Sequence, residues 1–509
     1  RVLGSLQDFG TVSGPSNSLH SGGILYSDWH SVGGGEAGHV VADPTDPDIV
    51  FAGEYLGFIS RYDRRTGQAP HVGIYPDDGS GHGAEDLRYR FQWTAPIVIS
   101  PHDPKLVYHA ANLLFKTENG GQSWQAISPD LTRDDETKQA WAGGPITGDN
   151  TGVEFYNTIF AVAESPLEAG LIWAGTDDGL VHLTRDGGES WSDVTPTGVP
   201  EWGTVSTIVA SRWDTGTAYV VVDAHRLDDE TPYLFKTSNY GRSWNSLTSG
   251  LDPEIYLHVV REDTRREGML YLGTERGVMV SRDDGAAWES LRLNMPTVSV
   301  VDLAVAGDDL VVGTLGRSAW ILDDLTPVRE MSKEIEAATE YLFEPLPAVR
   351  WRYAGSAYGS KDGAGKNPPK GASITYHLAE KPEGEITLEV LDAEGQVIRR
   401  LSSELREQYD SPDHPDWNPD SKPKPELKAE AGLNRVSWDL TYGEPKWMPN
   451  ARFDTGTPQP GPLVVPGDYT LRLTVGDRSI TQPMTVELDP RSSASESDLE
   501  QQLDFALGV

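Results

Sequence analysis

The octamer Thr184-Arg-Asp186-Gly-Gly188-Glu-Ser-Trp191 decides the fold, because its pattern recurs along the chain. Three further copies of Ser/Thr-x-Asp/Asn-x-Gly-x-x-Trp lie at 117–124, 237–244 and 281–288. The Asp or Asn can bond its own backbone two residues on, the Gly supplies a positive φ, and the Trp packs where the next strand starts. We expect each octamer to be a β-hairpin turn, with structural roles for Asn119, Trp124, Asp186, Trp191, Asn239, Trp244, Asp283 and Trp288.

Each octamer closes a unit of short apolar runs. In one unit the runs are 158–164, 171–176, 180–184 and the run that begins at Trp191. Four-stranded units repeated at this spacing are typical of β-propeller blades, with the octamer between the third and outermost strands. Two units at 39–63 and 300–322 keep the rhythm without an octamer. Residues 1–32 match the later part of a further blade, whose innermost strand we expect upstream of Arg1.

The sequence therefore predicts an all-β protein that begins with a seven-bladed propeller over 1–325, its first blade incomplete. Residues 326–371 are expected to form a helix, over 330–341, and then a linker rich in Gly, Lys and Ser. A period-2 pattern of six strands over 372–490 predicts an immunoglobulin-like β-sandwich with an Asp/Pro/Lys-rich insertion at 407–430. The tail, 491–509, begins with serines and acids ahead of spaced leucines, which predicts the start of a capped helix.

Composition excludes several classes of function. Acidic residues outnumber basic ones 78 to 42, a net charge of −36, which would repel nucleic acid. There is no cysteine, and no apolar run is long enough to span a membrane. Zinc-type histidine spacing, calcium loops, phosphate-binding loops and a serine nucleophile elbow are absent, so we expect no metal and no cofactor.

The octamers resemble the Asp-box, or BNR, repeat of sialidases, sortilin-type receptors and tandem-propeller xyloglucanases. Over nearly its whole length the chain is similar to large bacterial sortilin-like BNR proteins, most clearly at 14–20, 27–36, 89–93, 143–147 and 316–324. The resemblance implies a secreted or periplasmic protein with two propellers, of which this chain supplies most of the second and a C-terminal domain. The chain departs from the group by lacking the first half.

Two long loops, 75–94 and 130–157, are the first places to look for a site, because long loops in compact domains are often functional. With neighbouring loops of the same propeller face they supply the candidate ligand-binding residues Arg88, Arg90, Trp93, Glu201, Trp202, Arg276 and Arg317. Arginines and glutamates near a propeller channel also commonly pair between blades, and that structural role stays open.

The candidate catalytic residues are Glu36, Asp149, Glu154 and Tyr156. A sialidase needs an arginine cluster, a tyrosine with a carboxylate partner and an acid, which Arg90, Arg276, Arg317, Tyr156 and Glu154 could imitate. A two-carboxylate glycosidase needs only a pair such as Glu36 and Asp149 facing one sugar. The arginine-bearing signature that normally opens a sialidase propeller is absent.

The leading hypothesis is an extracytoplasmic binding or scaffold protein whose propeller face docks a protein or glycan partner. The alternative is a glycoside hydrolase that acts on extracellular polysaccharide. A third hypothesis is an accessory subunit of a larger periplasmic or membrane-associated assembly, without a membrane span of its own.

Overall fold

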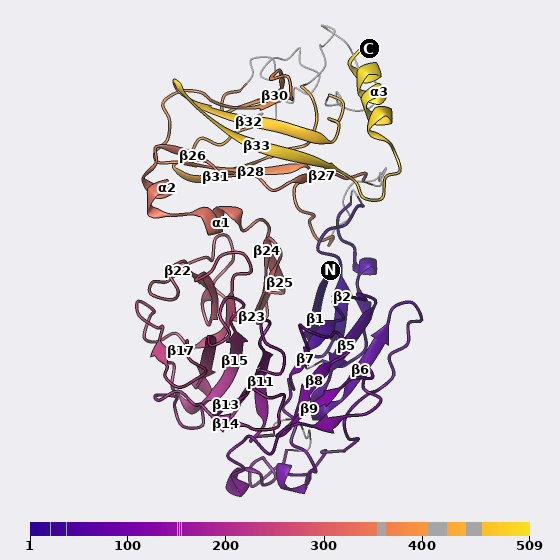
Figure 1. The fold of residues 1–509 in the computed structure, drawn as a ribbon, viewed down its shortest axis with the longest axis vertical. Coiled ribbons are helices and arrows are strands. Elements are labelled where there is room, and N and C mark those ends of the chain that lie inside the picture. The colour runs from indigo at the N-terminus through magenta and orange to yellow at the C-terminus, as the bar shows by residue number, and fades with distance from the viewer. Residues whose placement is uncertain are drawn as a thin grey trace. The chain divides into compact units, whose positions relative to one another are not determined.

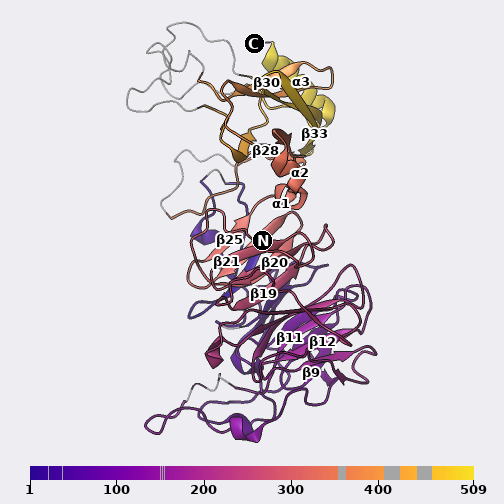
Figure 2. The same cartoon turned by 90° about the vertical axis from the view of Figure 1, so that its left-hand side faces the viewer.

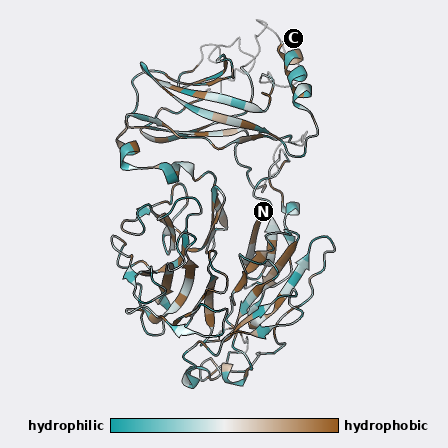
Figure 3. Ribbon diagram, viewed as in Figure 1, coloured by the Kyte–Doolittle hydropathy of each residue, from teal (hydrophilic) through white to brown (hydrophobic). Residues whose placement is uncertain are grey.

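The computed structural model is all-β and divides into two compact units. It describes residues 1–20, 22–36, 38–149, 151, 153, 155–353, 363–405, 425–443 and 461–508. The first unit comprises 1–16 and 25–322, and the second comprises 17–24 and 323–509. Apolar residues concentrate in the strands of both units (Figure 3).

The described residues of the first unit form seven antiparallel sheets that follow one another along the chain (Figure 1). Their strands are β1 (Val2–Leu6), β2 (Gly10–Gly14) and β3 (His30–Ser31); β4 (Val40–Ala42), β5 (Ile49–Gly53) and β6 (Ile59–Asp63); β7 (Ile97–Ile99), β8 (Val107–Ala110), β9 (Leu114–Thr117) and β10 (Gln125–Ala126); β11 (Ile159–Glu164), β12 (Ile172–Thr176), β13 (Val181–Thr184) and β14 (Ser192–Asp193); β15 (Thr204–Ala210), β16 (Ala218–Asp223), β17 (Tyr233–Thr237) and β18 (Asn245–Ser246); β19 (Leu257–Glu262), β20 (Leu270–Thr274), β21 (Gly277–Ser281) and β22 (Glu289–Ser290); β23 (Val300–Ala306), β24 (Asp309–Thr314) and β25 (Ala319–Leu322).

Within each sheet the strands pair in sequence order, as β11 and β12 do in Figure 2. From β4 onward, the first strand of each sheet contacts the first strand of the next. The core lies between adjacent sheets: Trp173 of β12 and Val205 of β15 are fully buried in one cluster. Such a stack buries both faces of every inner sheet, which explains why β12 and β16 read as continuous apolar runs.

Each octamer lies in the turn between the third and fourth strands of a sheet. In the second copy, Thr184 Oγ1 accepts from Gly188 N–H at 3.0 Å, and Asp186 Oδ1 accepts from Ser190 N–H at 2.9 Å. Trp191 leaves the turn and donates its indole N–H to the carbonyl of Ile127, in the preceding sheet, at 2.9 Å. The octamer is therefore a contact between sheets as well as a turn.

The octamer glycine meets the same neighbouring residue as the tryptophan. A Cβ on Gly188 would lie 2.3 Å from the Ile127 carbonyl oxygen, and its φ is +100°. The other copies repeat both contacts: Gly121 and Trp124 with Val72, Gly241 and Trp244 with Val194, and Gly285 and Trp288 with Leu247. Only glycine fits, because the position needs both a positive φ and a close approach of backbone.

The first sheet corresponds to the last three strands of the four-stranded sheets. After β3, Val32 N–H donates to the carbonyl of Thr11 in β2, as Ile127 after β10 donates to Leu114 in β9. β1 thus occupies the place of a second strand.

The described residues of the second unit form two sheets around one core. Their orders are β26 (Glu340–Leu342), β28 (Ala372–Leu378), β31 (Gly432–Trp438), and β27 (Ala348–Arg350), β33 (Arg478–Leu488), β32 (Gly467–Val475), β29 (Ile386–Leu391), β30 (Val397–Ser402). Tyr376 and Trp438 of the first sheet share a buried cluster with Leu388 and Leu471 of the second. Six strands, β28 to β33, lie within 372–490, where the sequence predicts six.

The helix expected over 330–341 is instead two short helices, α1 (Thr326–Glu330) and α2 (Lys333–Ala337), followed by β26. The chain is extended at Met331 (φ −50°, ψ 129°) between them, and Ser332 caps α2. The expected tail helix is α3 (Glu496–Leu507), with a capping box between Ser495 and Asp498. Residues 354–362 of the linker and 407–424 of the insertion lie outside the described residues.

Candidate functional site

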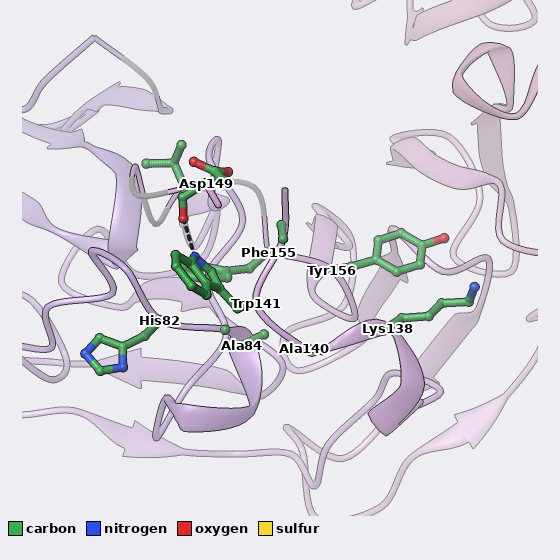
Figure 4. Close-up of a pocket in the computed structure, with 11 residues that line it drawn as sticks. His82, Ala84, Lys138, Ala140, Trp141, Asp149, Phe155 and Tyr156 are labelled. Carbon is green, nitrogen blue, oxygen red and sulfur yellow. Dashed lines mark hydrogen bonds between the residues drawn. The ribbon is translucent and has the colours of Figure 1, made fainter. Parts of the chain in front are cut away.

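The loops 75–94 and 130–157 meet around a cavity of about 50 Å³ (Figure 4). Glu85, in the short 3₁₀ turn Ala84–Asp86, donates its N–H to the Gln139 carbonyl at 3.0 Å and so joins the two loops. The cavity is lined by His82, Gly83, Ala84, Lys138, Ala140, Trp141, Ala142, Asp149, Val153, Phe155 and Tyr156.

Trp141 is the largest exposed aromatic group at this cavity, with 51% of its surface exposed. Its indole N–H donates to the Asp149 carbonyl, and its ring lies on Gly148, where a Cβ would come within 2.4 Å of the ring. A bridge between Gly143 and Gly148 closes the hairpin beneath it. The ring is therefore held in place while one side faces solvent.

Trp202 carries a second aromatic surface, beside Tyr156. The two rings are 6.2 Å apart, and Tyr156 Oη donates to the Trp202 carbonyl at 2.8 Å. Lys138 Nζ and the Arg133 guanidinium lie 4.5 and 4.9 Å from the Trp202 ring centre. The Trp202 φ is +66°, which is uncommon for a bulky residue and marks a position that the surrounding loops impose.

Buried polar residues join the two loops by hydrogen bonds. Arg90 is 8% exposed, and its guanidinium donates to Asp130 at 2.6 Å, to Thr132 at 3.1 Å and to the Asn157 carbonyl at 3.1 Å. These three bonds tie the loop 75–94 to the loop 130–157. Arg90 therefore has the structural role, pairing with groups of another loop, that the sequence left open as an alternative to ligand binding.

Asp177 and Asp178 directly follow β12 and are both buried. Asp177 accepts from Thr158 N–H at 2.9 Å and from Thr158 Oγ1 at 2.6 Å, and Asp178 accepts from Asn157 Nδ2 at 2.6 Å. Burial raises the pKa of Asp177 to about 8, and the charge of Asp178 adds to the shift. Burial, together with these two acids, also raises the pKa of Tyr156, so its phenol is protonated at neutral pH.

Other candidate ligand-binding residues lie apart from this cavity lining or pair with other groups. Arg88 is exposed and lies 4.9 Å from the Tyr75 ring, and Arg276 bonds Asp252 at 2.9 Å. Trp93 is half-buried, with its N–H on the Gln92 side chain. Glu201 and Arg317 are exposed.

Of the candidate catalytic residues, Asp149 and Tyr156 both line this cavity, whereas Glu36 is not among its lining residues. Glu36 accepts from Asp8 N–H at 2.6 Å, and Asp149 accepts from Thr151. Glu154 lies outside the described residues. A Cβ on Gly35, the residue before Glu36, would lie 2.2 Å from the Glu54 carboxyl carbon. Burial and then the charge of Glu36 raise the pKa of Glu54.

Sequence reasoning missed Arg133 and Lys138, which complete the Trp202 surface. Both are cations in the long loop that was singled out, so their place in that loop was the available signal. No group of three or more acidic or histidine residues in the described parts of the chain could hold a metal ion. No helix among those residues is long and apolar enough to cross a membrane.

No protein-family model matches the sequence, and no curated protein matches it. Among solved structures, a GH74 xyloglucanase from Xanthomonas campestris is 16% identical with a TM-score of 0.44, and the match covers 91% of this chain and 76% of that one. A GH74 enzyme from Niastella koreensis is 15% identical with a TM-score of 0.33, over 61% of this chain and 45% of that one. YCF48 bound to a D1 peptide is 11% identical with a TM-score of 0.29, over 62% and 98%. These scores all lie below 0.5, so the similarity assigns no activity to this chain.

Proposed function

We propose that this chain is a secreted or periplasmic binding protein that docks a glycan or protein partner on the loops 75–94 and 130–157. The observation that carries the proposal is Trp141. Its ring is half exposed at a cavity, yet its N–H and one face are already fixed by Asp149 and Gly148. A ring that is immobilised before binding loses little conformational entropy when a partner covers it.

The neighbouring Trp202 surface indicates an anionic group on the partner. Lys138 and Arg133 bring two positive charges to this ring although the chain as a whole carries a net charge of −36. An apolar surface with a few convergent polar groups is typical of ligand sites. An acidic sugar or an acidic peptide side chain would satisfy both cations.

The proposal includes an architecture: a seven-bladed propeller of the Asp-box type, followed by an immunoglobulin-like sandwich. Seven consecutive sheets and four repeated inter-sheet octamers support the propeller. Two sheets around one core support the sandwich. Such a binding protein could serve as an accessory subunit of a larger periplasmic or membrane-associated assembly.

Electrophoresis in native gels that contain an acidic pectin or a neutral xyloglucan tests the proposal. We expect retardation in one gel, reduced about tenfold in apparent affinity by Trp141→Ala, since anchoring aromatics typically contribute more than 1 kcal/mol. Trp213→Ala is the matched control, because Trp213 is also partly exposed (38%) but lies in the turn between β15 and β16. If both substitutions weaken retardation equally, the loops are not the site. If neither gel retards the protein, a protein partner is sought by pull-down, and the proposal fails if Trp141→Ala leaves that partner bound.

A glycoside hydrolase is the second candidate, and the proximity of Glu54 and Glu36 favours it. Glu54, whose pKa burial raises, could act as a general acid with Glu36 as the second carboxylate. Release of reducing ends in the same gels, lost in Glu54→Gln, would make hydrolysis the function.

A further inference from the structure

His258, in β19, lies between a serine hydroxyl and a carboxylate. Ser299 Oγ is 2.9 Å from His258 Nε2, and Asp223 Oδ2 is 3.6 Å from His258 Nδ1. Asp223 ends β16 and Ser299 immediately precedes β23, so three successive sheets supply the three groups. This is the arrangement that activates serine for acyl transfer: the nucleophile contacts a base, and the base contacts a group that orients it.

The surroundings hold the imidazole in position. The Tyr256 ring packs edge-on against it at 5.1 Å, and the His258 carbonyl accepts from Ser206 Oγ at 2.8 Å. Asp223 is itself fixed, because its other oxygen bonds His225 Nδ1 at 2.6 Å. The Asp223–His258 distance is slightly longer than a hydrogen bond, as is common in triads without a substrate.

The imidazole is also in the protonation state that a general base needs. Burial lowers the pKa of His258, and this effect exceeds the opposing influence of Asp223 and then of Glu275, which lies 4.0 Å from Nε2. His258 is therefore neutral at pH 7, and Nε2 can accept the Ser299 proton when Nδ1 carries the hydrogen that faces Asp223.

We propose that Ser299, His258 and Asp223 form an acyl-transfer site that hydrolyses carboxylic esters with an apolar acyl group. The apolar preference comes from Leu315, whose N–H donates to the Ser299 carbonyl at 3.0 Å. Leu315 is 70% exposed, so an apolar side chain is accessible on the segment whose backbone bonds to the serine.

In the first half-reaction, Ser299 Oγ attacks the ester carbonyl carbon and its proton moves to His258 Nε2. The ester C–O bond then breaks, and the leaving alkoxide takes that proton and departs as the alcohol. In the second half-reaction, water attacks the acyl-enzyme and gives a proton to His258 Nε2. The bond to Ser299 Oγ breaks, the serine recovers the proton, and the carboxylic acid leaves. The net change is ester plus water to acid plus alcohol.

Labelling of the full chain with a fluorophosphonate probe, read by peptide mass spectrometry, tests the proposal directly. We expect one adduct on Ser299 and hydrolysis of p-nitrophenyl butyrate. The adduct should be absent in Ser299→Ala, and His258→Asn should slow hydrolysis by about 10²–10⁴-fold, the usual contribution of a general base. A hydrogen bond with a merely structural role would produce no covalent adduct.

Ser206→Ala is the matched control, because Ser206 also bonds His258 but through the backbone carbonyl and not the ring. It should keep both the adduct and the hydrolysis. The proposal is overturned if the folded wild-type chain is not labelled, if the adduct lies on another residue, or if Ser299→Ala retains hydrolysis. Since the first two results come from the unaltered chain, they do not depend on whether a variant folds.

Discussion

At the scale of single residues, burial raises the pKa of Asp177, near the candidate site, and so links stability to pH. Its folded pKa of about 8 lies above its ordinary value of 3.8, so the folded state binds the proton more tightly than the unfolded chain does. The stability linked to this proton is fully present below about pH 3.8 and is lost as the pH rises toward 8 and beyond. Asp177→Asn keeps the acceptor for Thr158 N–H and removes the titration.

We therefore expect Asp177→Asn to flatten the pH dependence of unfolding. Melting temperatures of the wild type should fall from pH 5 to pH 9 by more than those of the variant, and the variant should be the more stable protein at pH 9. Equal falls in both proteins would contradict the assigned role of Asp177 in this proton linkage.

The hydrogen-bond partners of single residues are what the sequence predicts least well. Arg90 and Tyr156 were recognised as polar and aromatic residues in a long loop, and both do lie at the junction of the two loops. Their partners could not be predicted, because Arg90 bonds Asp130 from 40 residues away and Tyr156 bonds Trp202 from 46. Periodicity reports which face of an element is apolar and carries no information about such contacts.

At the scale of elements, two glycines of the octamer turn distinguish the cost of a positive φ from the cost of a steric collision. Gly187 and Gly188 both have positive φ, at +72° and +100°, but a Cβ on Gly187 would meet nothing within 4 Å. A Cβ on Gly188 would collide with the Ile127 carbonyl at 2.3 Å. The adjacent glycines thus form a matched pair within one turn.

Gly187→Ala should destabilise the protein by about 1–2 kcal/mol, the cost of a left-handed L-residue. Gly188→Ala should cost about 1–3 kcal/mol more, because the neighbouring sheet must shift to admit the methyl group. Urea unfolding monitored by tryptophan fluorescence measures the difference. If the two variants are equally stable, the octamer acts as a turn alone and not as a contact between sheets.

The strand order and the octamer positions could be predicted because both depend on short-range patterns. Residues 180–184 and Trp191 enclose a turn whose chemistry is complete within eight residues. The bond from Trp191 to Ile127 spans 64 residues and was invisible to that reasoning. The prediction of one helix over 330–341 was wrong about where the helix begins. Sequence patterns fix boundaries poorly, and the extended residue Met331 ends α1.

At the scale of the whole molecule, neither unit is continuous in sequence. The chain leaves the first unit after Ser16, contributes 17–24 to the second unit, and returns at Leu25. Within the second unit, Ile24 pairs with Gly365, and Asn367 exchanges hydrogen bonds of 2.8 Å with both the N–H and the carbonyl of Ser18. This exchange was not predictable from composition, which suggested only a linker between the expected helix and residue 372.

Asn367→Ala should release this segment without unfolding the rest, because it removes side-chain bonds worth about 1 kcal/mol each from a short, loop-like element. Hydrogen exchange followed by mass spectrometry should show faster exchange for peptides that cover 18–24 and 365, with β11–β14 unchanged. Asn17→Ala is the control, since Asn17 is exposed in the same segment. A fragment that begins at 323 should show the same loss at 365, because it lacks the strand partner that Ile24 provides. Full protection of 365 in that fragment would mean that the second unit folds without 17–24.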